Sequence, residues 1–482
     1  MAVPSRRSFL KTFSLAAAGA ALSPRAWAQV AGANTDIRLG IAGLNGRGKD
    51  LIREFGALPG VRIVALCDAD SAVLAAAAQA RRDAGGEVRT FADLRELLAQ
   101  KDIDAIALAT PNHLHALQAV WACQAGKDVY LEKPVSHNLW EGRKIVEAAT
   151  KYQRVVQAGS QCRSSDSLAE AVEWVHAGNL GKITSARGLC YKRRASLGLT
   201  ASPPPVPATV NYDLWCGPAP LVSPHRAKFH YDWHWFWATG NGDLGNQGVH
   251  QLDIARWFLG EAAPAPRVLT VGGRLGYTDD GETPNTLLVW HDYAAAPLLF
   301  EVRGLPARTG ASAMDSFQGA SIGVIVQCEG GSVVVPSYTT ANALDRDGKL
   351  LKKFTGASSH AGNFIDVVRS RKLSDLRAPI QEGHASAALA HLANISHRLG
   401  HAAAPEAVRE QFRASPALTA SFARLAEHLA ANAVDLEQTP LTLGLPLAFD
   451  PAAERCTGEN AAAANALLTR EYRKPYVVPE SV

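Results

Sequence analysis

The sequence predicts two α/β units in series: a doubly wound parallel sheet, and then an α+β domain built on an open, largely antiparallel sheet. The chain has 482 residues, of which 47% are hydrophobic, so it is long enough for two or three domains. From residue 36 to about residue 160, short apolar segments alternate with helical ones, whereas the second half is rich in strand signals. We therefore expect one domain at 36–160 and another at 161–482.

Residues 1–28 have the pattern of an export signal. Arg6 and Arg7 precede a short apolar run at 12–22, and a small-x-small sequence ends at Ala28. This pattern is typical of a twin-arginine signal peptide cleaved after Ala28, which predicts an exported, periplasmic protein. The apolar run is shorter than the ~20 residues of a membrane-spanning helix, so we expect no membrane association after cleavage.

The charge of the chain is balanced once this segment is set aside. The segment holds four of the 49 basic residues and none of the 45 acidic ones, so the rest carries no net charge. A neutral body has no electrostatic footprint for nucleic acid. The seven cysteines include no C-x-x-C pair, so we expect them to be free, buried thiols. His230 and His234 have the i, i+4 spacing of metal ligands but no evident third ligand, so we expect no metal.

Each element of the first domain follows from its own residues. The segment at 37–42 is short, apolar and suited to a strand that is buried on both faces, as parallel sheets require. The same pattern predicts strands at 61–67, 103–109, 128–131 and 155–159. The segments between them predict helices at 49–57, 72–82, 91–100, 112–125 and 139–150. This alternation implies a parallel sheet with right-handed crossovers.

A glycine-rich turn follows the first strand. The sequence GLNGRG at 43–48 matches G-x-G-x-x-G at its first and last glycine, with an asparagine at the middle one. Such a turn places phosphates on backbone N–H groups at the start of the next helix. A carboxylate at the end of the second strand accepts hydrogen bonds from ribose hydroxyls. We therefore predict a Rossmann domain that binds NAD through Gly43, Asn45, Gly46, Arg47, Gly48 and Asp68.

Two alternatives stay open at this turn. Asp68 repels a 2′-phosphate and so favours NAD over NADP, but Arg47 nearby weakens that preference. The turn could also belong to an unrelated α/β domain, in which Asp68 would only cap a helix.

Two further loops follow strands at the same edge of the sheet. Ligands collect at strand carboxyl ends in open α/β sheets, so we predict that these loops contact the cofactor. Lys133 could also stabilise a substrate alkoxide, and a solvated surface lysine is the alternative. The predicted contacts are Thr110, Pro111, Asn112 and His115 in the first loop, and Glu132 and Lys133 in the second.

These motifs resemble those of the Gfo/Idh/MocA oxidoreductases, the family of glucose–fructose oxidoreductase and inositol dehydrogenase. The resemblance rests on GLNGRG at 43–48, CDAD at 67–70, ATPNHLHA at 109–116, EKP at 132–134 and GDLGNQGVHQLD at 242–253. It implies NAD or NADP in the first domain and a substrate site on one face of an open sheet in the second. It also implies a homo-oligomer that packs through the other face, and an exported branch of the family.

The second half fits that α+β domain. Strands are predicted at 183–191, 268–275, 286–293, 298–303, 320–328 and 332–335, the last two joined by a Gly-Gly turn. Ala-rich helices at 384–399 and 417–433 are expected to pack back onto the first domain. Residues 202–207 form a proline-rich loop, a candidate lid or subunit arm.

Aromatic side chains gather at 230–237. Tyr231, Trp233 and Trp235 lie in this segment, and the C–H faces of sugars stack on such rings. We predict that all three bind substrate, and an aromatic core cluster is the alternative. Arg163 and Lys192 could bind a carboxylated sugar, with a solvated basic surface as the alternative.

His250 is the strongest catalytic candidate. In the family pattern an acid stands four residues before this histidine, and residues at i and i+4 share a helix face. Here that position is Asn246, which can orient a hydroxyl but cannot accept a proton. We predict His250 as the base, Lys133 as the group that stabilises the alkoxide, and Asn246 as an orienting residue. Asp253 could orient the imidazole or simply anchor the helix.

Three functions follow from these residues and the resemblance. The first is an exported NAD(P)-dependent oxidoreductase that transfers hydride between a hydroxyl of a sugar or sugar derivative and its cofactor. The second is an NAD-dependent glycoside hydrolase that acts by transient oxidation at C3, and the third is a non-catalytic sugar or nucleotide binder. Because a diffusible cofactor is scarce outside the cytoplasm, we expect the nucleotide to be tightly bound.

Overall fold

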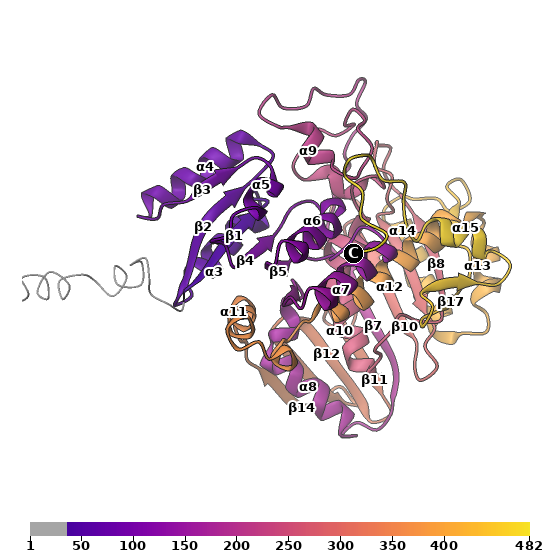
Figure 1. Cartoon of the computed structure of the whole chain (residues 1–482). Coiled ribbons are helices and arrows are strands. Elements are labelled where there is room, and N and C mark those ends of the chain that lie inside the picture. The colour runs from indigo at the N-terminus through magenta and orange to yellow at the C-terminus, as the bar shows by residue number, and fades with distance from the viewer. Residues whose placement is uncertain (1–35) are drawn as a thin grey trace, which may run out of the picture.

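The computed structural model describes residues 36–482, and Figure 1 shows its two sheets with their helices. Residues 1–35, which include the predicted signal peptide, lie outside the described residues. Within 36–482, the helices are too short or too polar for any of them to cross a bilayer. All seven cysteines are free and buried, as the sequence predicts.

The first domain contains a six-stranded parallel sheet in the order β3-β2-β1-β4-β5-β6. The strand order reverses between β1 and β4, and doubly wound folds bind their ligands at such a point. The strands are β1 (Ile37–Ala42), β2 (Val61–Cys67), β3 (Arg89–Phe91), β4 (Ala105–Leu108), β5 (Asp128–Leu131) and β6 (Val156–Ala158). The helices are α3 (Arg47–Gly56), α4 (Ser71–Asp83), α5 (Leu94–Leu98), α6 (Asn112–Gln124) and α7 (Leu139–Lys151). The predicted Rossmann fold is confirmed.

One segment of this domain differs from the prediction. The expected helix at 91–100 is shorter than predicted: Phe91 ends strand β3, and only Leu94–Leu98 form the helix α5. Asp93 accepts a 2.9 Å hydrogen bond from the backbone N–H of Arg95, so the helix begins only at Leu94. An N-cap inside a predicted helix marks its true start, and the residues before it are free to pair with β2.

The second domain is built on a twelve-stranded mixed sheet, which confirms the predicted fold class. Its main path runs β14-β13-β12-β11-β7-β10-β9-β8-β16-β15, and β7 and β10 are its parallel neighbours. Six of the strands match predictions closely: β7 (Ile183–Tyr191), β8 (Arg267–Gly273), β9 (Thr286–His291), β10 (Leu298–Arg303), β11 (Ile322–Cys328) and β12 (Gly331–Ser337). The others were not predicted: β13 (Thr340–Asp345), β14 (Leu350–Thr355), β15 (His401–Ala403), β16 (Leu441–Leu443), β17 (Leu447–Asp450) and β18 (Arg455–Thr457).

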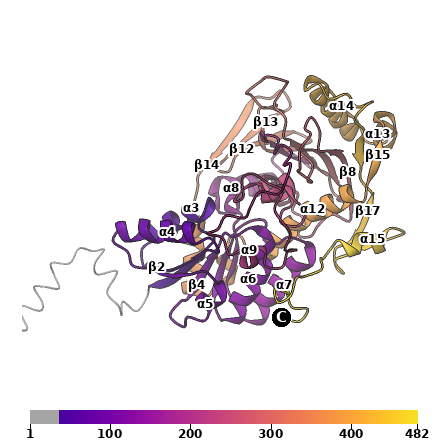
Figure 2. The same cartoon turned by 90° about the horizontal axis from the view of Figure 1, so that it is seen from above.

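Helices cover one face of this sheet and join it to the first domain. They are α8 (Asp166–His176), α10 (Val249–Leu259) and α12 (Ile380–Arg398). Helix α12 contacts α7 of the first domain on one side, and α10 and β8 of the second domain on the other (Figure 2). The predicted packing of the 384–399 helix against the first domain is therefore confirmed.

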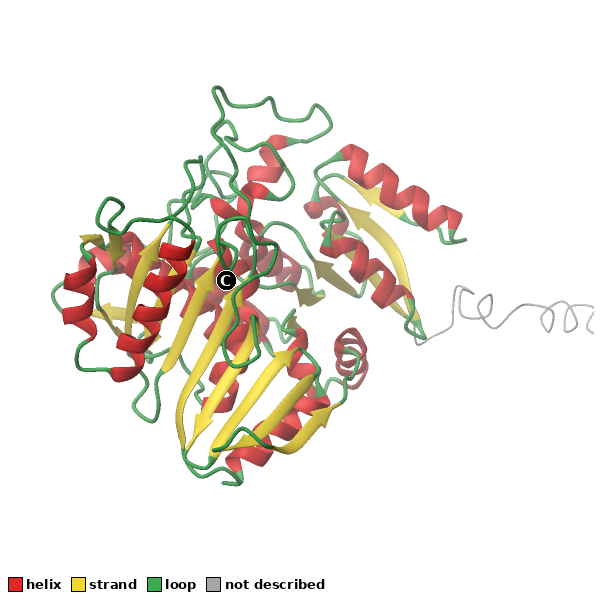
Figure 3. Cartoon of the chain, turned by 180° about the vertical axis from the view of Figure 1, so that it is seen from behind, coloured by secondary structure: helices red, strands yellow, loops and turns green. Residues whose placement is uncertain are grey.

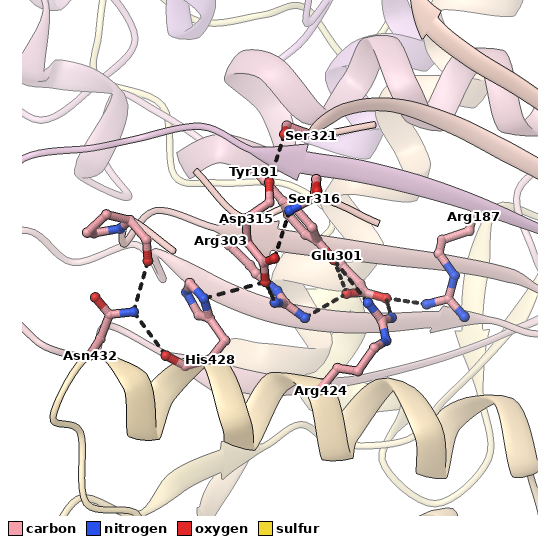
Figure 4. Close-up of polar contacts among 11 residues, drawn as sticks. Arg187, Tyr191, Glu301, Arg303, Asp315, Ser316, Ser321, Arg424, His428 and Asn432 are labelled. Atoms are coloured by element: carbon pink, nitrogen blue, oxygen red, sulfur yellow. Dashed lines mark hydrogen bonds and ion pairs between the residues drawn. The ribbon is translucent and has the colours of Figure 1, made fainter. Parts of the chain in front are cut away.

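The opposite face of the sheet carries α13 (Pro405–Phe412) and α14 (Pro416–Ala431) at one end only (Figure 3). Figure 4 shows how ion pairs hold α14 there. Glu301 of β10 is 2% exposed and pairs with Arg187 of β7 and, at 2.5 Å, with Arg424 of α14. The 417–433 helix thus packs on the sheet, and its predicted packing against the first domain is wrong.

Shorter elements complete the chain. Helices α9 (Tyr212–Cys216), α11 (His360–Ser370) and α15 (Ala461–Ala466) lie in connecting segments. Short 3₁₀ turns occur at Gln161–Ser164, Asp232–Trp235 and Leu373–Asp375, and a π-helical turn at Leu244–Gly248 leads into α10.

Candidate functional site

A cleft of about 710 Å³ opens at the carboxyl ends of β1, β2, β4 and β5, and the second domain forms its other wall. Most of the predicted site residues line it: Gly43, Asn45, Gly46, Arg47, Asp68, Thr110, Pro111, Asn112, His115, Glu132, Lys133, Tyr231, Trp233, Asn246 and His250. Four predicted residues do not line it, namely Gly48, Arg163, Lys192 and Trp235.

Two close backbone approaches shape the glycine turn. A Cβ on Gly43, where φ is +79°, would lie 2.5 Å from the carbonyl carbon of Ala109. A Cβ on Gly48 would lie 1.9 Å from the carbonyl oxygen of Gly43, so Gly48 is needed although it does not line the cleft. Positive φ falls on Gly43 and Gly46 and not on Asn45, which therefore fits without a left-handed backbone. Because the glycine positions carry no side chains, the backbone of the turn is open to the pyrophosphate of a dinucleotide.

Asp68 lies beside this turn at the end of β2. Its carboxylate oxygens accept backbone N–H groups from Leu44 at 2.8 Å and Asp70 at 2.9 Å. Each oxygen keeps further acceptor capacity for a ribose hydroxyl. Burial raises the pKa of Asp68, which shows that negative charge is poorly solvated here and that a second anionic group would be costly.

Arg47 is held by two carboxylates. Its Nη1 lies 2.6 Å from Glu54, and its Nε lies 2.8 Å from Glu132. Glu132 is 4% exposed and also accepts a hydrogen bond from Gln161 at 3.0 Å. Because these acids occupy its donors, Arg47 has few left for a 2′-phosphate.

His115 ties together the two loops that follow β4 and β5. Its ring nitrogens lie 2.7 Å from the carbonyl oxygens of Thr110 and Pro134. Asn112 in the same loop donates a 2.6 Å hydrogen bond to the side chain of Asn241 in the second domain. The loops predicted to contact the cofactor are therefore fixed both to each other and to the opposite domain.

Lys133 reaches across the domain boundary. Its Nζ donates a 2.6 Å hydrogen bond to the backbone carbonyl of Asn246. Burial lowers the pKa of Lys133, and the neighbouring Glu132 opposes that shift. This lysine is thus not a solvated surface residue, and a partly desolvated ammonium stabilises a developing alkoxide more strongly than one in water.

A single π-helical turn presents Asn246 to the cleft. The glycines of this turn allow close packing: a Cβ on Gly245 would lie 2.6 Å from the Cβ of Asn241. A Cβ on Gly248 would lie 2.9 Å from the ring of Phe300. Isolated π-helical turns are frequent at functional sites. The GDLGNQG motif therefore encodes both the unusual backbone and the position of Asn246.

His250 lies one turn further along, on α10. It is 6% exposed, its Nδ1 has no hydrogen-bond partner among the described residues, and its ring lies 5.0 Å from that of Tyr338. Burial, and then the charge of Lys133, hold the pKa of His250 well below its usual value. The lysine and the histidine predicted to act together are therefore close enough to interact in one cleft, with the imidazole neutral.

Asp253 does not orient His250. Its carboxylate accepts a 2.6 Å hydrogen bond from Ser386 of α12 and pairs with Arg163, whose Nη2 lies 2.9 Å away. Arg163 also lies 3.0 Å from Glu382 and is 8% exposed. The interpretation of Arg163 as a substrate ligand is corrected: its guanidinium joins α10 to α12 and has no access to the cleft.

Lys192 reaches the cleft only through other side chains. Its Nζ donates a 2.9 Å hydrogen bond to Gln247, and the Gln247 amide donates a 2.6 Å hydrogen bond to the hydroxyl of Tyr338. Tyr338 lines the cleft beside His250. The prediction that Lys192 contacts substrate is therefore corrected to an indirect role.

The aromatic segment divides between cleft and core. Trp233 stacks on His234 with ring centroids 3.7 Å apart, and both line the cleft. Tyr231 lies at the exposed rim, where its hydroxyl accepts a 2.9 Å hydrogen bond from Arg194. Trp235 is 5% exposed, and the guanidinium of Arg194 lies over it, 4.9 Å from the centroid of the Trp235 ring. Trp235 thus follows the core alternative, because Arg194 and the surrounding chain cover its ring.

Several cleft residues were missed by sequence reasoning. They are Trp121, Gln161, His230, His234, Tyr338 and Tyr476. Trp215 also lines the cleft, as expected of the segment 212–215 as a second aromatic contribution to the pocket. His230 and His234 lie in the aromatic segment and could have been included with it. Tyr338 and Tyr476 carry no local motif, because the fold brings a hairpin turn and the C-terminal segment to the cleft.

Both domains match one family. Residues 37–160 match the oxidoreductase family with an NAD-binding Rossmann fold, and residues 176–285 match the C-terminal α/β domain of the same Gfo/Idh/MocA family.

Three curated relatives illustrate the range of that likeness. Levoglucosan dehydrogenase of Pseudarthrobacter phenanthrenivorans is 29% identical over 194 residues, 40% of this chain and 42% of its own. Inositol 2-dehydrogenase 1 of Saccharopolyspora erythraea is 34% identical over 147 residues, 30% of this chain and 43% of its own. Glycosyl hydrolase family 109 protein 2 of a Shewanella species is 30% identical over 186 residues, 34% of this chain and 41% of its own. The matched segments thus span about two fifths of each relative.

Solved structures show the same fold. The WlbA dehydrogenase from Bordetella pertussis, solved with NADH and UDP-GlcNAcA, is 20% identical with a TM-score of 0.54, over 74% of this chain and 93% of that one. A levoglucosan dehydrogenase, solved with NADH and levoglucosan, is 19% identical with a TM-score of 0.53, over 74% of this chain and 95% of that one.

Proposed function

Because the chain belongs to the Gfo/Idh/MocA oxidoreductase family and contains that family's NAD(P)-binding Rossmann domain, we propose that it is a carbohydrate oxidoreductase. It would transfer hydride between a hydroxyl of a sugar or sugar derivative and a tightly held nicotinamide cofactor. The observation that carries this proposal is the meeting of Lys133 and His250, which come from different domains, in one cleft. Relatives named for levoglucosan and inositol support a carbohydrate substrate.

The residues of the cleft divide the chemistry among them. The bound nicotinamide would supply the hydride acceptor. His250 is held neutral, so it can accept the hydroxyl proton of the substrate. The ammonium of Lys133 stabilises negative charge on the same oxygen, and the side chain of Asn246 orients the hydroxyl between them. Trp233 and Tyr231 offer ring faces to the sugar.

NAD fits the cleft better than NADP. Asp68 lies where the adenosine ribose of a Rossmann ligand binds, in surroundings that already disfavour negative charge. The nearby Arg47 is engaged by Glu54 and Glu132. A 2′-phosphate would therefore meet a carboxylate and a guanidinium whose donors are mostly taken by Glu54 and Glu132.

Two segments close over the nucleotide half of the cleft and support tight retention. The long loop before α9 bonds to the start of α4, where the carbonyl of Thr209 accepts a 2.9 Å hydrogen bond from the backbone N–H of Ser71. His230, in the segment after α9, lies 2.9 Å from Asp70 and adds a second contact to the same end of α4. The C-terminal segment is fastened to α9, where Asp213 accepts a 2.5 Å hydrogen bond from Tyr476. We refer to these two segments, 206–217 and 472–476, as the clasp.

The first test is to identify the nucleotide and the substrate in one sample. The purified protein should retain nucleotide through gel filtration, and mass spectrometry of the released molecule should show NAD or NADH. A panel of aldoses, inositol, levoglucosan and aryl glycosides should then change the absorbance of the bound cofactor. His250→Ala should lose far more turnover than Asn246→Ala. Equal losses would refute His250 as the main base, and nucleotide-free protein would refute retention.

A second candidate function is NAD-dependent glycoside hydrolysis through transient oxidation at C3. The glycosyl hydrolase family 109 relative favours it, and so does the clasp, because such an enzyme restores its cofactor in every turnover. Release of aglycone from aryl glycosides without net change in NADH absorbance would establish this function. Accumulation of a ketone or lactone only with an added carbonyl acceptor would establish the first.

Two features of the wider proposal concern the whole protein. We propose export by the twin-arginine pathway with cleavage after Ala28, supported by the sequence of residues 1–28. Exchange of Arg6 and Arg7 for lysine should leave the protein in the cytoplasm, and unchanged export would refute this route.

We also propose a homo-oligomer, which light scattering of the purified protein would test.

A further inference from the structure

A second cavity, of about 350 Å³, lies behind the cofactor cleft and shares no lining residue with it. Its walls come from the loop after β5, the loop before the π-helical turn, α12 and the segment after α15. His137, Trp237, Asn394, Arg398 and Arg470 are the residues that give it chemical character. Four separate parts of the chain thus meet around a polar hollow at the domain junction.

Two arginines give this cavity positive charge. Within residues 36–482, no carboxylate lies within 4.0 Å of the guanidinium of Arg398 or Arg470. Arg398 lies 5.2 Å from the ring centroid of Trp237, and Arg470 lies 3.2 Å from Nδ1 of His137. Most other arginines near the domain junction are bound to acids, as Arg163 and Arg256 are. Arg398 is exposed to solvent, whereas Arg470 is partly buried. A partly buried cation without a counter-ion, as Arg470 is, is unfavourable unless an anion binds beside it.

Three acids lie near the pair, and none of them forms an ion pair with either arginine. Glu282 lies near Arg398 and accepts a 2.6 Å hydrogen bond from the backbone N–H of Trp237. Glu141 is fully buried and already accepts hydrogen bonds from the backbone N–H of His137 at 2.9 Å and from the hydroxyl of Tyr472 at 3.1 Å. Glu471 lines the cavity but is exposed to solvent. Glu141 and Glu282 therefore offset part of the positive charge, but neither guanidinium has a carboxylate in direct contact among residues 36–482.

Buried polar atoms in the wall also lack partners. Asn394 is 5% exposed, and its amide nitrogen donates to the carbonyl of Asn241 at 3.0 Å, while its Oδ1 has no partner among the described residues. Nε2 of His137 is likewise buried without a described partner. Because Arg470 can only donate to Nδ1 of His137, the proton of a neutral ring would sit on Nε2. The wall thus offers a spare acceptor on Asn394, while the backbone of Trp237 lies beside the ring of His137.

We propose that this cavity is a second ligand site, which binds a small molecule bearing an oxyanion, a carboxylate or a phosphate ester, between Arg398 and Arg470. Guanidinium groups bind both kinds of oxyanion through paired N–H donors, and the ring of Trp237 offers an apolar surface to the rest of the ligand. The side-chain oxygen of Asn394 is placed to accept a hydrogen bond from a hydroxyl of the ligand. The volume limits the ligand to about the size of a sugar acid or a sugar phosphate.

The site is connected to the cofactor cleft by one asparagine. Asn241 accepts the 2.6 Å hydrogen bond from Asn112, which lines the cleft, and donates a 2.9 Å hydrogen bond to the carbonyl of His137. The same residue accepts from Asn394. A ligand that orders this wall would therefore also hold the two domains together, and it should raise the temperature of thermal unfolding.

Isothermal titration of the full-length protein tests the proposal, with NAD in excess so that the glycine turn is filled. The probes are inorganic phosphate and gluconate, in low-salt buffer free of other multivalent anions. We expect at least one probe to bind, and we expect Arg470→Gln and Arg398→Gln each to weaken it about tenfold or more. Preference for phosphate or gluconate identifies the oxyanion.

Arg413→Gln is the matched control, because Arg413 is 79% exposed at the end of α13, does not line the cavity, and lies on the sheet face opposite α12. It should leave binding unchanged. Since Arg470 is partly buried, its variant is first checked for an unchanged unfolding temperature, and the more exposed Arg398 provides an independent variant. The proposal would be overturned if neither probe binds. It would also be overturned if a probe binds and both arginine variants bind it as tightly as the wild type. A loss of redox turnover in these variants is not required, so the test is independent of the proposed activity.

Discussion

Acidification should destabilise this protein steeply, because its fold buries many neutral histidines. Burial lowers the pKa of five nearly inaccessible rings to about 3 or about 4: His113, His291, His360, His391 and His428. In the unfolded chain each ring has a pKa near 6.5. Below that value the unfolded state therefore binds more protons, so stability is retained above pH ~6.5 and is lost as the pH falls toward the folded values.

The size of the effect follows from linkage. Consider one histidine whose pKa is about 6.5 in the unfolded chain and about 4 in the folded protein. Its contribution to the free energy of unfolding drops by roughly 2 kcal/mol between neutral pH and about pH 5. Five such rings lose up to about 10 kcal/mol, which is comparable with the whole stability of a typical domain. We therefore expect the unfolding temperature to drop sharply between about pH 7 and about pH 5.

Thermal unfolding followed by circular dichroism across this pH range is the assay. His291 is 0% exposed and neither of its ring nitrogens has a partner among the described residues, so His291→Leu should remove one proton from the linkage. The variant should gain about 2 kcal/mol relative to the wild type between about pH 8 and about pH 5. His225→Leu is the control, because that ring is exposed in the folded protein. An unfolding temperature that stays level from neutral to mildly acidic pH would refute the reasoning.

Three further predictions concern the site and its supports. Arg163→Met should cost about 3–5 kcal/mol of stability in denaturant unfolding, because it leaves the buried Asp253 without its main partner, and the KM for substrate should not change. Asp213→Asn should speed nucleotide release several-fold in a dialysis assay by weakening the bond to Tyr476, and an unchanged rate would contradict the clasp. Asn246→Asp should raise the pKa of His250, so the acidic limb of the kcat/KM profile should move to higher pH.

Local sequence patterns were enough to predict most of the first domain and much of the cleft. Buried parallel strands are continuous apolar runs, and the loops at their carboxyl ends share one edge, so the order of the motifs along the chain is enough to group the cofactor residues. The placing of Lys133 and His250 in one cleft also followed, since both carry motifs of the family, whereas the π-helical turn that holds Asn246 was not predicted. What failed was the assignment of side-chain partners.

The failures have a common physical cause. Arg163 and Trp235 have the residue types of a sugar site, but each is satisfied inside the fold, by Asp253 and by Arg194. A sequence shows which groups a residue offers and not which distant group takes them. The strands β13 to β18 were missed for a related reason: all of them are three to six residues long, and their pairing depends on neighbours brought together by the sheet.

Helix α14 restricts how copies of this protein could assemble. By occupying one end of this sheet face, α14 leaves only the part over β11 to β14 for a neighbouring subunit, and there Ile325 and Val334 are already buried beneath Phe317. A twofold axis through the middle of the sheet would drive α14 of one copy into α14 or the strands of the other. An assembly built on this face would therefore have to be offset toward the β14 edge. Helix α14 would then lie along one border of the interface between the two subunits.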